Sequence, residues 1–203
     1  MTNPTEVIQG SDEWFALRLG KVTASKVSDV MSKGTGRATY MDDLLAERMS
    51  GQSKPSFTND AMRWGTEQEP YARQAYEVDQ ECFVEETGFW EHDELALGVS
   101  PDGLVGEGGL VEIKCPNSST HVGWLRTKKV PAKHIKQIQC QLWVTGRSWC
   151  DFVSYDPRMI DTKNRLMVVR CKRDDALITK MELEVRKFLT ELDGWTKGES
   201  DEQ

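Results

Sequence analysis

A chain of 203 residues with a net charge of −7 has the size of one globular domain with a substantial core, so we expect residues 1–203 to form a single domain. No apolar run approaches the roughly 18 residues of a membrane-spanning helix, and the polar N-terminus predicts no signal peptide and no membrane partner. The five cysteines are scattered and never form a C-x-x-C pair, which predicts reduced thiols in a cytoplasmic protein rather than a disulfide framework or a zinc site.

Helical periodicity and capping residues predict helices over residues 11–19, 24–31, 40–49, 59–78, 131–145 and 174–192. Pro70 is expected to kink the fourth of these helices or to begin a new one. Strand patterns cover residues 83–86, 89–92, 95–100, 104–105, 110–114, 149–155 and 166–171. The first two strands are expected to pair as a hairpin around residues 87–88. This order of elements predicts an α+β fold, a central mixed β-sheet flanked by helices.

The strand predicted over residues 110–114 carries the most informative pattern. Glu112 and Lys114 are two residues apart, so they share one face of the strand, and Ile113 points to the opposite face and into a core. Asp102 lies ten residues before Glu112, and a short hairpin turn through residues 106–109 can bring it beside the strand. We therefore expect two carboxylates and one amine to converge.

A Glu-x-Lys pair on a strand is usually a solvated face with a cross-strand ion pair. Here the apolar residues Leu110, Val111 and Ile113 predict a buried strand, where charges are costly unless they are paired or bind a metal. Carboxylate oxygens are the ligands that Mg²⁺ prefers. The pattern thus favours a site that holds Mg²⁺ against a phosphodiester and activates a water beside it.

Basic residues are concentrated in one part of this acidic chain. Residues 115–150 contain no Asp or Glu, and an earlier loop adds Lys33 and Arg37. This distribution favours a groove that holds a polyanion over an uneven solvated surface. The predicted groove residues within the acid-free stretch are Arg126, Lys128, Lys129, Lys133 and Lys136.

Several short motifs occur in a fixed order along the chain. They are Trp14, residues 17–20, 23–25 and 64–69, Ser100-Pro101-Asp102-Gly103, Glu112-Ile113-Lys114-Cys115-Pro116, residues 137–145, and Tyr155-Asp156-Pro157-Arg158-Met159. The set resembles the lambda-type phage exonucleases, a viral recombinase branch of the PD-(D/E)xK nucleases, which have the restriction-endonuclease-like fold. The likeness runs from about Gln9 to the final helix, so it implies that residues 1–203 are one nuclease domain.

The resemblance implies a role for each residue at the predicted metal site. Asp102 and Glu112 would bind Mg²⁺, or Mn²⁺, together with the backbone carbonyl of Ile113. Lys114 would position or polarise the attacking water. Gln139, on the helix that follows the core strands, would help to orient that water.

The resemblance also implies a second metal ion and a pocket for the end of the substrate. Glu69 would reach in from its helix and assist the second metal site, which gives two ions per active site. Arg18, Ser25 and Ser100 match the family's pocket for a terminal 5′-phosphate. Taken one at a time, Arg18 could instead be a surface ion-pair partner, Ser25 and Ser100 turn residues, and Glu69 a solvated helix charge.

The family's activity and partners are expectations from the same resemblance. Its members digest one strand of linear double-stranded DNA in the 5′ to 3′ direction, release mononucleotides, and leave a 3′ single strand for recombination by annealing. They form homotrimeric rings and work with a single-strand DNA annealing protein in the cytoplasm of a bacterial host cell.

Two alternative functions remain open on the sequence. A sequence-specific endonuclease on the same core would need an added element that reads base edges, and no inserted segment of that kind is apparent. A non-catalytic DNA-binding module would have no use for the paired carboxylates of Asp102 and Glu112.

Overall fold

The computed structural model describes residues 4–53 and 59–196. Its centre is a five-stranded sheet in the order β2-β5-β6-β7-β8, whose strands span Val84–Glu85, Gly103–Val105, Gly109–Lys114, Trp149–Tyr155 and Leu166–Lys172. Strands β6 and β7 are parallel and the other neighbours are antiparallel, so the sheet is mixed as predicted. A three-stranded sheet lies beside it in the order β1-β4-β3, with strands Val22–Thr23, Leu97–Val99 and Trp90–Glu91.

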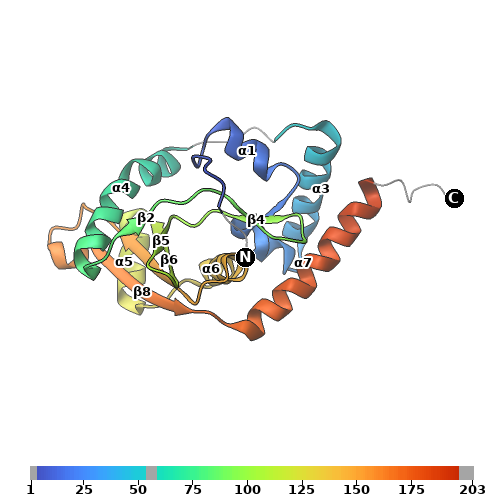
Figure 1. Ribbon diagram of the computed structural model, residues 1–203. Coiled ribbons are helices and arrows are strands. Elements are labelled where there is room, and N and C mark those ends of the chain that lie inside the picture. Colours follow the sequence, from blue (N-terminus) through green and yellow to red (C-terminus); the bar gives the residue numbers. More distant parts are fainter. Residues whose placement is uncertain (1–3, 54–58, 197–203) are drawn as a thin grey trace.

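Helices surround the sheets, and α6 lies in the middle of the molecule (Figure 1). Within the described ranges the helices are α1 (Asp12–Arg18), η1 (Ala24–Lys26), α2 (Val27–Val30), α3 (Thr35–Ser50), α4 (Asp60–Gln80), α5 (Ser118–Thr127), α6 (Ala132–Thr145), η2 (Thr162–Asn164) and α7 (Asp175–Thr196). Helix α6 contacts α2 and α7 as well as strand β7, so it separates the five-stranded sheet from the outer helices. In this part of the chain no helix has the length and apolar character needed to cross a membrane.

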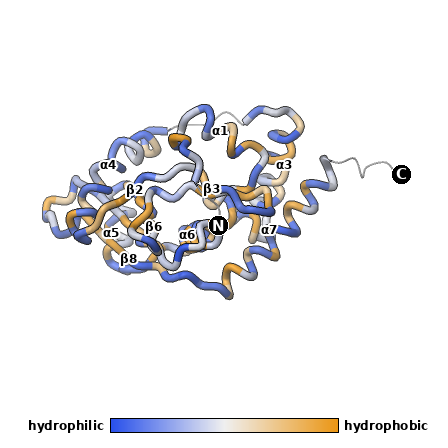
Figure 2. Tube along the Cα trace, in the orientation of Figure 1, coloured by the Kyte–Doolittle hydropathy of each residue, from blue (hydrophilic) through white to orange (hydrophobic). Residues whose placement is uncertain are grey.

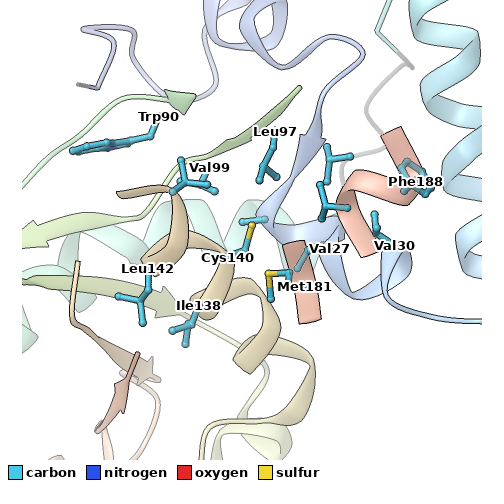
Figure 3. Close-up of a cluster of buried hydrophobic side chains, with 14 of the residues drawn as sticks. Val27, Val30, Trp90, Leu97, Val99, Ile138, Cys140, Leu142, Met181 and Phe188 are labelled. Carbon is cyan, nitrogen blue, oxygen red and sulfur yellow. The ribbon is translucent and has the colours of Figure 1, made fainter. Parts of the chain in front are cut away.

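Two hydrophobic clusters divide the core because neighbouring residues of a strand point to opposite faces. Leu110 of β6 belongs to the larger cluster, which includes residues of α2, α6 and α7 (Figure 3). Val111 and Ile113 belong to the smaller cluster, which packs against Tyr76 of α4. Hydrophilic and hydrophobic residues alternate along α7, and α4 is mostly hydrophilic (Figure 2). The alternation predicted for this strand is therefore confirmed, and it turns Glu112 toward α6.

The predicted hairpin before Glu112 is also confirmed. Strands β5 and β6 pair in an antiparallel register that joins Gly103 to Val111 and Val105 to Gly109. The turn between them needs a left-handed backbone at Gly106, where φ is +54°, a conformation that glycine adopts without steric cost.

Strands β2 and β3 do not form the hairpin predicted around residues 87–88. They belong to different sheets, since β2 pairs with β5 and β3 pairs with β4. The N-terminal segment lies over the intervening residues, where the Thr5 amide donates to the Phe89 carbonyl and a Cβ at Gly88 would come within 2.0 Å of the Thr5 carbonyl oxygen. Gly88, which has no Cβ, therefore permits this close approach of two backbones.

Two further predictions about helices need correction. Helix α5 was not predicted from the sequence. It begins after Asn117, whose side chain accepts a hydrogen bond from the Thr120 amide. Pro70 does not begin a new helix, because α4 continues through it from Asp60 to Gln80.

The buried histidines serve the fold. His121 has no exposed surface, and its two ring nitrogens lie 2.7 Å from the Ser154 hydroxyl and 2.7 Å from the Asn164 carbonyl. His134 is 8% exposed and packs between the rings of Trp124 and Phe152. Burial lowers the pKa of His134 to about 4 from its ordinary 6.5, because this environment disfavours the charged imidazolium.

This shift predicts a loss of stability in acid. A histidine with a depressed folded pKa stabilises the fold above its unfolded pKa, and that stabilisation is lost as the pH falls from about 6.5 to 4. We expect the free energy of unfolding to decrease between pH 7 and pH 4 by about 3 kcal/mol more in the wild type than in His134→Phe. Denaturant titrations at each pH measure the difference. Trp124→Phe is the control, because it alters the same aromatic packing without removing a titrating group. Equal pH dependence of wild type and His134→Phe would contradict the prediction.

Candidate active site

The hairpin brings the two predicted carboxylates to the same level of the sheet. Asp102 directly precedes β5, and its neighbour Gly103 pairs with Val111 of β6. The Asp102 carboxylate accepts the backbone N–H of Ile113 at 2.6 Å, which fixes it beside the strand. Glu112 stands on the adjoining position of β6 with no exposed surface. Asp102 and Glu112, which are ten residues apart in the sequence, thus lie close together in the fold.

The Lys114 ammonium occupies the point at which three predicted ligand oxygens meet. Its Nζ lies 2.5 Å from Glu112 Oε1, 2.9 Å from the Ile113 carbonyl oxygen and 3.7 Å from Asp102 Oδ2. Burial alone would lower the pKa of Lys114, but the carboxylates of Glu112 and Asp102 raise it above its ordinary value. Lys114 is therefore a firmly protonated cation at this point.

These oxygens fit a divalent cation. Two carboxylates and one carbonyl form a set of hard oxygen donors, and they already surround one positive charge. Burial and the neighbouring Glu112 raise the pKa of Asp102. The nearby positive charge therefore does not fully compensate the negative charge of Asp102. Among residues 4–53 and 59–196 no cluster of three or more His, Cys, Asp or Glu side chains could hold a metal. The donor set at this site consequently depends on the backbone carbonyl as well as on the two carboxylates.

Gln139 does not face this site, which corrects the role implied for it by the resemblance. Its amide donates to the Lys172 carbonyl at 2.8 Å, and its carbonyl accepts the Asp174 N–H at 2.8 Å. Gln137 and Gln141 donate instead to Glu112, at 2.6 Å and 2.7 Å. Residues four apart share a face of a helix, and the residue midway between them points away.

Glu69 approaches the site from α4. The Arg73 guanidinium lies 3.3 Å from its carboxylate, and its charge interacts with those of Lys114 and Glu112. Burial raises the pKa of Glu69, and Arg73 and Lys114 act in the opposite direction. Glu69 thus belongs to the electrostatic surroundings of the metal site without contacting its donor atoms in this structure.

The three residues predicted to bind the terminal phosphate line one cleft, and two of them, Arg18 and Ser100, contact Trp14. The Trp14 indole N–H donates to the Ser100 hydroxyl at 2.9 Å, and the Arg18 guanidinium stacks 3.9 Å from the centre of the indole ring. Ser25 is exposed on η1, and its hydroxyl lies 3.4 Å from that of Thr23. Burial lowers the pKa of Arg18. Among the described residues no carboxylate forms an ion pair with its guanidinium, so this charge is available to an external anion.

One cleft contains both the residues predicted to bind a terminal phosphate and those predicted to bind a metal. Its volume is about 180 Å³. The cleft is lined by Gln9, Trp14, Arg18, Ala24, Ser25, Ser100, Asp102, Glu112, Lys114, Gln137 and Gln141. An anion held by Arg18 and a phosphodiester at the carboxylates would therefore share one continuous space.

The predicted groove residues lie outside this cleft. Arg126, Lys128, Lys129, Lys133 and Lys33 are exposed, and Lys136 is half-buried. Arg37 is already paired, because its guanidinium lies 2.8 Å from the Glu191 carboxylate and stacks on Phe188. The groove assignment remains a prediction for the exposed residues.

Five residues that line the cleft had no predicted role in the site. They are Gln9, Trp14, Ala24, Gln137 and Gln141. Helical phase was the signal that could have found the two later glutamines, because residues 137 and 141 flank the predicted Gln139 at the spacing of one turn. Nothing in the sequence indicates that the Trp14 indole bonds Ser100.

Solved structures share this architecture. The alkaline exonuclease LHK-Exo from Laribacter hongkongensis is 48% identical, with a TM-score of 0.88 over 92% of this chain and 95% of that one. The same figures hold for LHK-Exo in complex with dAMP. A phage-related exonuclease from Haemophilus somnus 129PT is 18% identical, with a TM-score of 0.70 over 87% of this chain and 95% of that one, and therefore supports the fold alone.

Sequence comparison agrees with these structures. The uncharacterized protein R354 of Acanthamoeba polyphaga mimivirus is 27% identical over 159 residues, which cover 71% of this chain but only 28% of that longer protein. The model of the YqaJ-like viral recombinase domain matches residues 13–148, which include the predicted metal-site residues and every residue of the cleft except Gln9. The resemblance to a viral recombinase branch of nucleases is confirmed, and the chain belongs to the YqaJ-like viral recombinase domain family.

Proposed function

We propose that this protein is a metal-dependent DNA exonuclease that degrades one strand of linear duplex DNA from a 5′-phosphorylated end, in the 5′ to 3′ direction, to mononucleotides. The observation that carries the proposal is that Asp102, Glu112 and the Ile113 carbonyl surround one positive charge, the Lys114 ammonium. Arg18 lines the same cleft. The similarity to LHK-Exo, an alkaline exonuclease also solved with dAMP, supports it.

Asp102, Glu112 and the Ile113 carbonyl would hold Mg²⁺, and Mn²⁺ can replace it because both accept oxygen ligands. Glu69 would assist a second ion. Bound there, the metal supplies Lewis-acid stabilisation of charge on the phosphoryl oxygens and on the leaving 3′-oxygen. The donors are fixed by the strand and by the Ile113 N–H, so they need little rearrangement on binding.

Lys114 would orient the attacking water and stabilise negative charge that develops beside it. Its pKa is raised by the two carboxylates, so it keeps its proton at neutral pH and acts as a cation rather than as a base. Its flexible stem lets the ammonium move from the oxygens to a water or phosphoryl oxygen at the same point.

The Arg18 pocket would select the end of the DNA strand. A terminal phosphate carries nearly two charges and lacks the second ester of an internal phosphate. The Arg18 guanidinium can bind such a group through two N–H donors, and the Ser25 and Ser100 hydroxyls can donate to its remaining oxygen atoms. Because Trp14 fixes both Arg18 and Ser100, the pocket is organised before the substrate arrives.

The wider biological role belongs to the same proposal. Membership of a viral recombinase family supports the production of a 3′ single strand for recombination by annealing, with a single-strand annealing protein as partner. We also propose a homotrimeric ring around the duplex and a location in the cytoplasm of a bacterial host cell.

Asp102→Asn tests the metal-dependent activity. Asparagine can still accept the Ile113 N–H through its amide oxygen, but it has lost the charge that attracts a divalent cation. We expect hydrolysis of linear duplex in Mg²⁺ to fall by at least about 100-fold with the fold intact, given that even residues around a metal's ligands contribute 10–100-fold. Release of acid-soluble nucleotides measures hydrolysis, and circular dichroism measures the fold.

Covalently closed circular duplex is the control substrate for the wild type. Loss of the linear form alone supports the exonuclease. Discrete fragments from the circle would indicate an endonuclease, and survival of both forms would indicate a DNA-binding protein. Wild-type turnover by Asp102→Asn at equal Mg²⁺ would remove this residue from the metal site.

Arg18→Ala tests recognition of the strand end. We expect the wild type to degrade 5′-phosphorylated duplex faster than 5′-hydroxyl duplex, and Arg18→Ala to lose about 1.5–3 kcal/mol of that preference, the usual contribution of a hydrogen bond to a charged group. Initial rates on the two substrates measure it. Lys26→Ala is a matched control, because Lys26 adjoins Ser25 but pairs with Asp29 outside the cleft. An undiminished preference in Arg18→Ala would show that the phosphate binds elsewhere.

The exposed lysines after α5 test the groove. Each phosphate contact that is removed should change the slope of log affinity against log salt by about 0.9, whatever the DNA sequence. We therefore expect Lys128→Ala and Lys129→Ala to weaken binding of duplex DNA and to flatten its salt dependence. Fluorescence anisotropy at several salt concentrations measures both, with Lys180→Ala, a lysine of α7, as control. Slopes equal to that of the wild type would place these lysines away from the duplex.

A further inference from the structure

We propose that Gln141 is a positioning residue that fixes the Glu112 carboxylate. This inference rests on the proposed metal site and assigns a role to a residue outside the set that the sequence motifs indicated. It depends on two separate observations, the hydrogen bond from Gln141 to one oxygen of Glu112 and the hydrogen bond from Gln137 to the other oxygen.

The two oxygens of Glu112 are held by different groups. Oε1 accepts from Gln137 at 2.6 Å and lies 2.5 Å from the Lys114 ammonium. Oε2 accepts from Gln141 at 2.7 Å. Among the described residues, Gln141 is thus the residue that holds the second oxygen, Oε2.

A bond to each oxygen is what fixes the plane of a carboxylate. The terminal torsion of a glutamate side chain joins an sp³ to an sp² carbon and has no sharp staggered minimum, so one donor leaves the carboxylate free to rotate. Gln137 and Gln141 are one helical turn apart on α6 and clamp the group from one rigid element. The lone pair that Glu112 offers to a metal is then aimed before the metal binds.

The orientation of the Gln141 amide follows from its partner. The Glu112 carboxylate can only accept, so the nitrogen of Gln141 must face it and the oxygen must face away. That oxygen, Oε1, is buried without a partner, although Gln141 itself lines the cleft. A buried acceptor left unpaired costs free energy.

Gln139 supplies a matched control on the same helix. It is buried like Gln141, but its amide donates to the Lys172 carbonyl and accepts the Asp174 N–H. Its replacement therefore removes side-chain hydrogen bonds from the same helix, at least as many as in the Gln141 variants, without touching Glu112. Any effect of general destabilisation should occur equally in both variants.

The experiment measures binding of Mn²⁺ to the full chain by isothermal titration calorimetry, without DNA. We expect Gln141→Met, which keeps the length of the side chain but not its amide, to weaken binding of Mn²⁺ about 10-fold, the scale of residues that orient metal ligands. Gln139→Met should leave the Kd within twofold of wild type while lowering the unfolding temperature. Gln137→Met should have a smaller effect than Gln141→Met, because Lys114 still holds Oε1.

The outcomes separate this inference from the proposed function. Gln141→Asn, which keeps the amide but withdraws it by one methylene, is the second variant if Gln141→Met fails to fold, and it should weaken binding similarly. If the wild type binds Mn²⁺ and the Gln141 variants bind it equally well, the positioning role is wrong while the metal site stands. If binding of Mn²⁺ weakens equally in the Gln141 and Gln139 variants, Gln141 contributes only to the stability of the fold. No binding by the wild type would remove the metal site itself, and this inference with it.

Discussion

The Glu112 carboxylate on strand β6 has no exposed surface, so neighbouring side chains must replace the water that would otherwise solvate it. Glu112 is held by the Lys114 ammonium and by the amides of Gln137 and Gln141. A buried ion pair that loses one partner typically costs 3–5 kcal/mol, because the remaining charge has neither water nor a counter-ion. The strand, its lysine and the central helix α6 are therefore bound into one unit, and the metal site uses the charges that this unit concentrates.

The arrangement explains why Lys114 contacts the oxygens that would bind a metal. Without a divalent cation, the Lys114 ammonium offsets the negative charges of Glu112 and Asp102. On the proposed function, a bound cation would take over that neutralisation, and Lys114 could then contact the water and the phosphoryl group. The same oxygens would then serve both stability and chemistry, with Asp102 held in place by the Ile113 N–H.

Local patterns along the chain predicted the parts of the site that depend on one strand or one turn. Alternation on β6 placed Glu112 and Lys114 on one face, and the glycine-rich turn brought Asp102 beside them. The choice of Gln139 failed because two glutamines one turn apart, rather than the one between them, face Glu112. The hairpin predicted at residues 87–88 failed because Thr5, far away in sequence, pairs with Phe89. The first error concerns the role implied by the resemblance, which helical phase could have corrected. The second concerns tertiary packing, which local periodicity does not contain.

The cleft is assembled from parts of the chain that are synthesised at different times. Trp14 and Arg18 leave the ribosome before Ser100 and the carboxylates, and Gln141 follows them. The indole of Trp14 can hold Ser100 only after the later segment has folded against it. On the proposed function, a nascent chain that ends before α6 would therefore lack a complete site for a DNA end, and its capacity to cut DNA would arise only after α6 has been made.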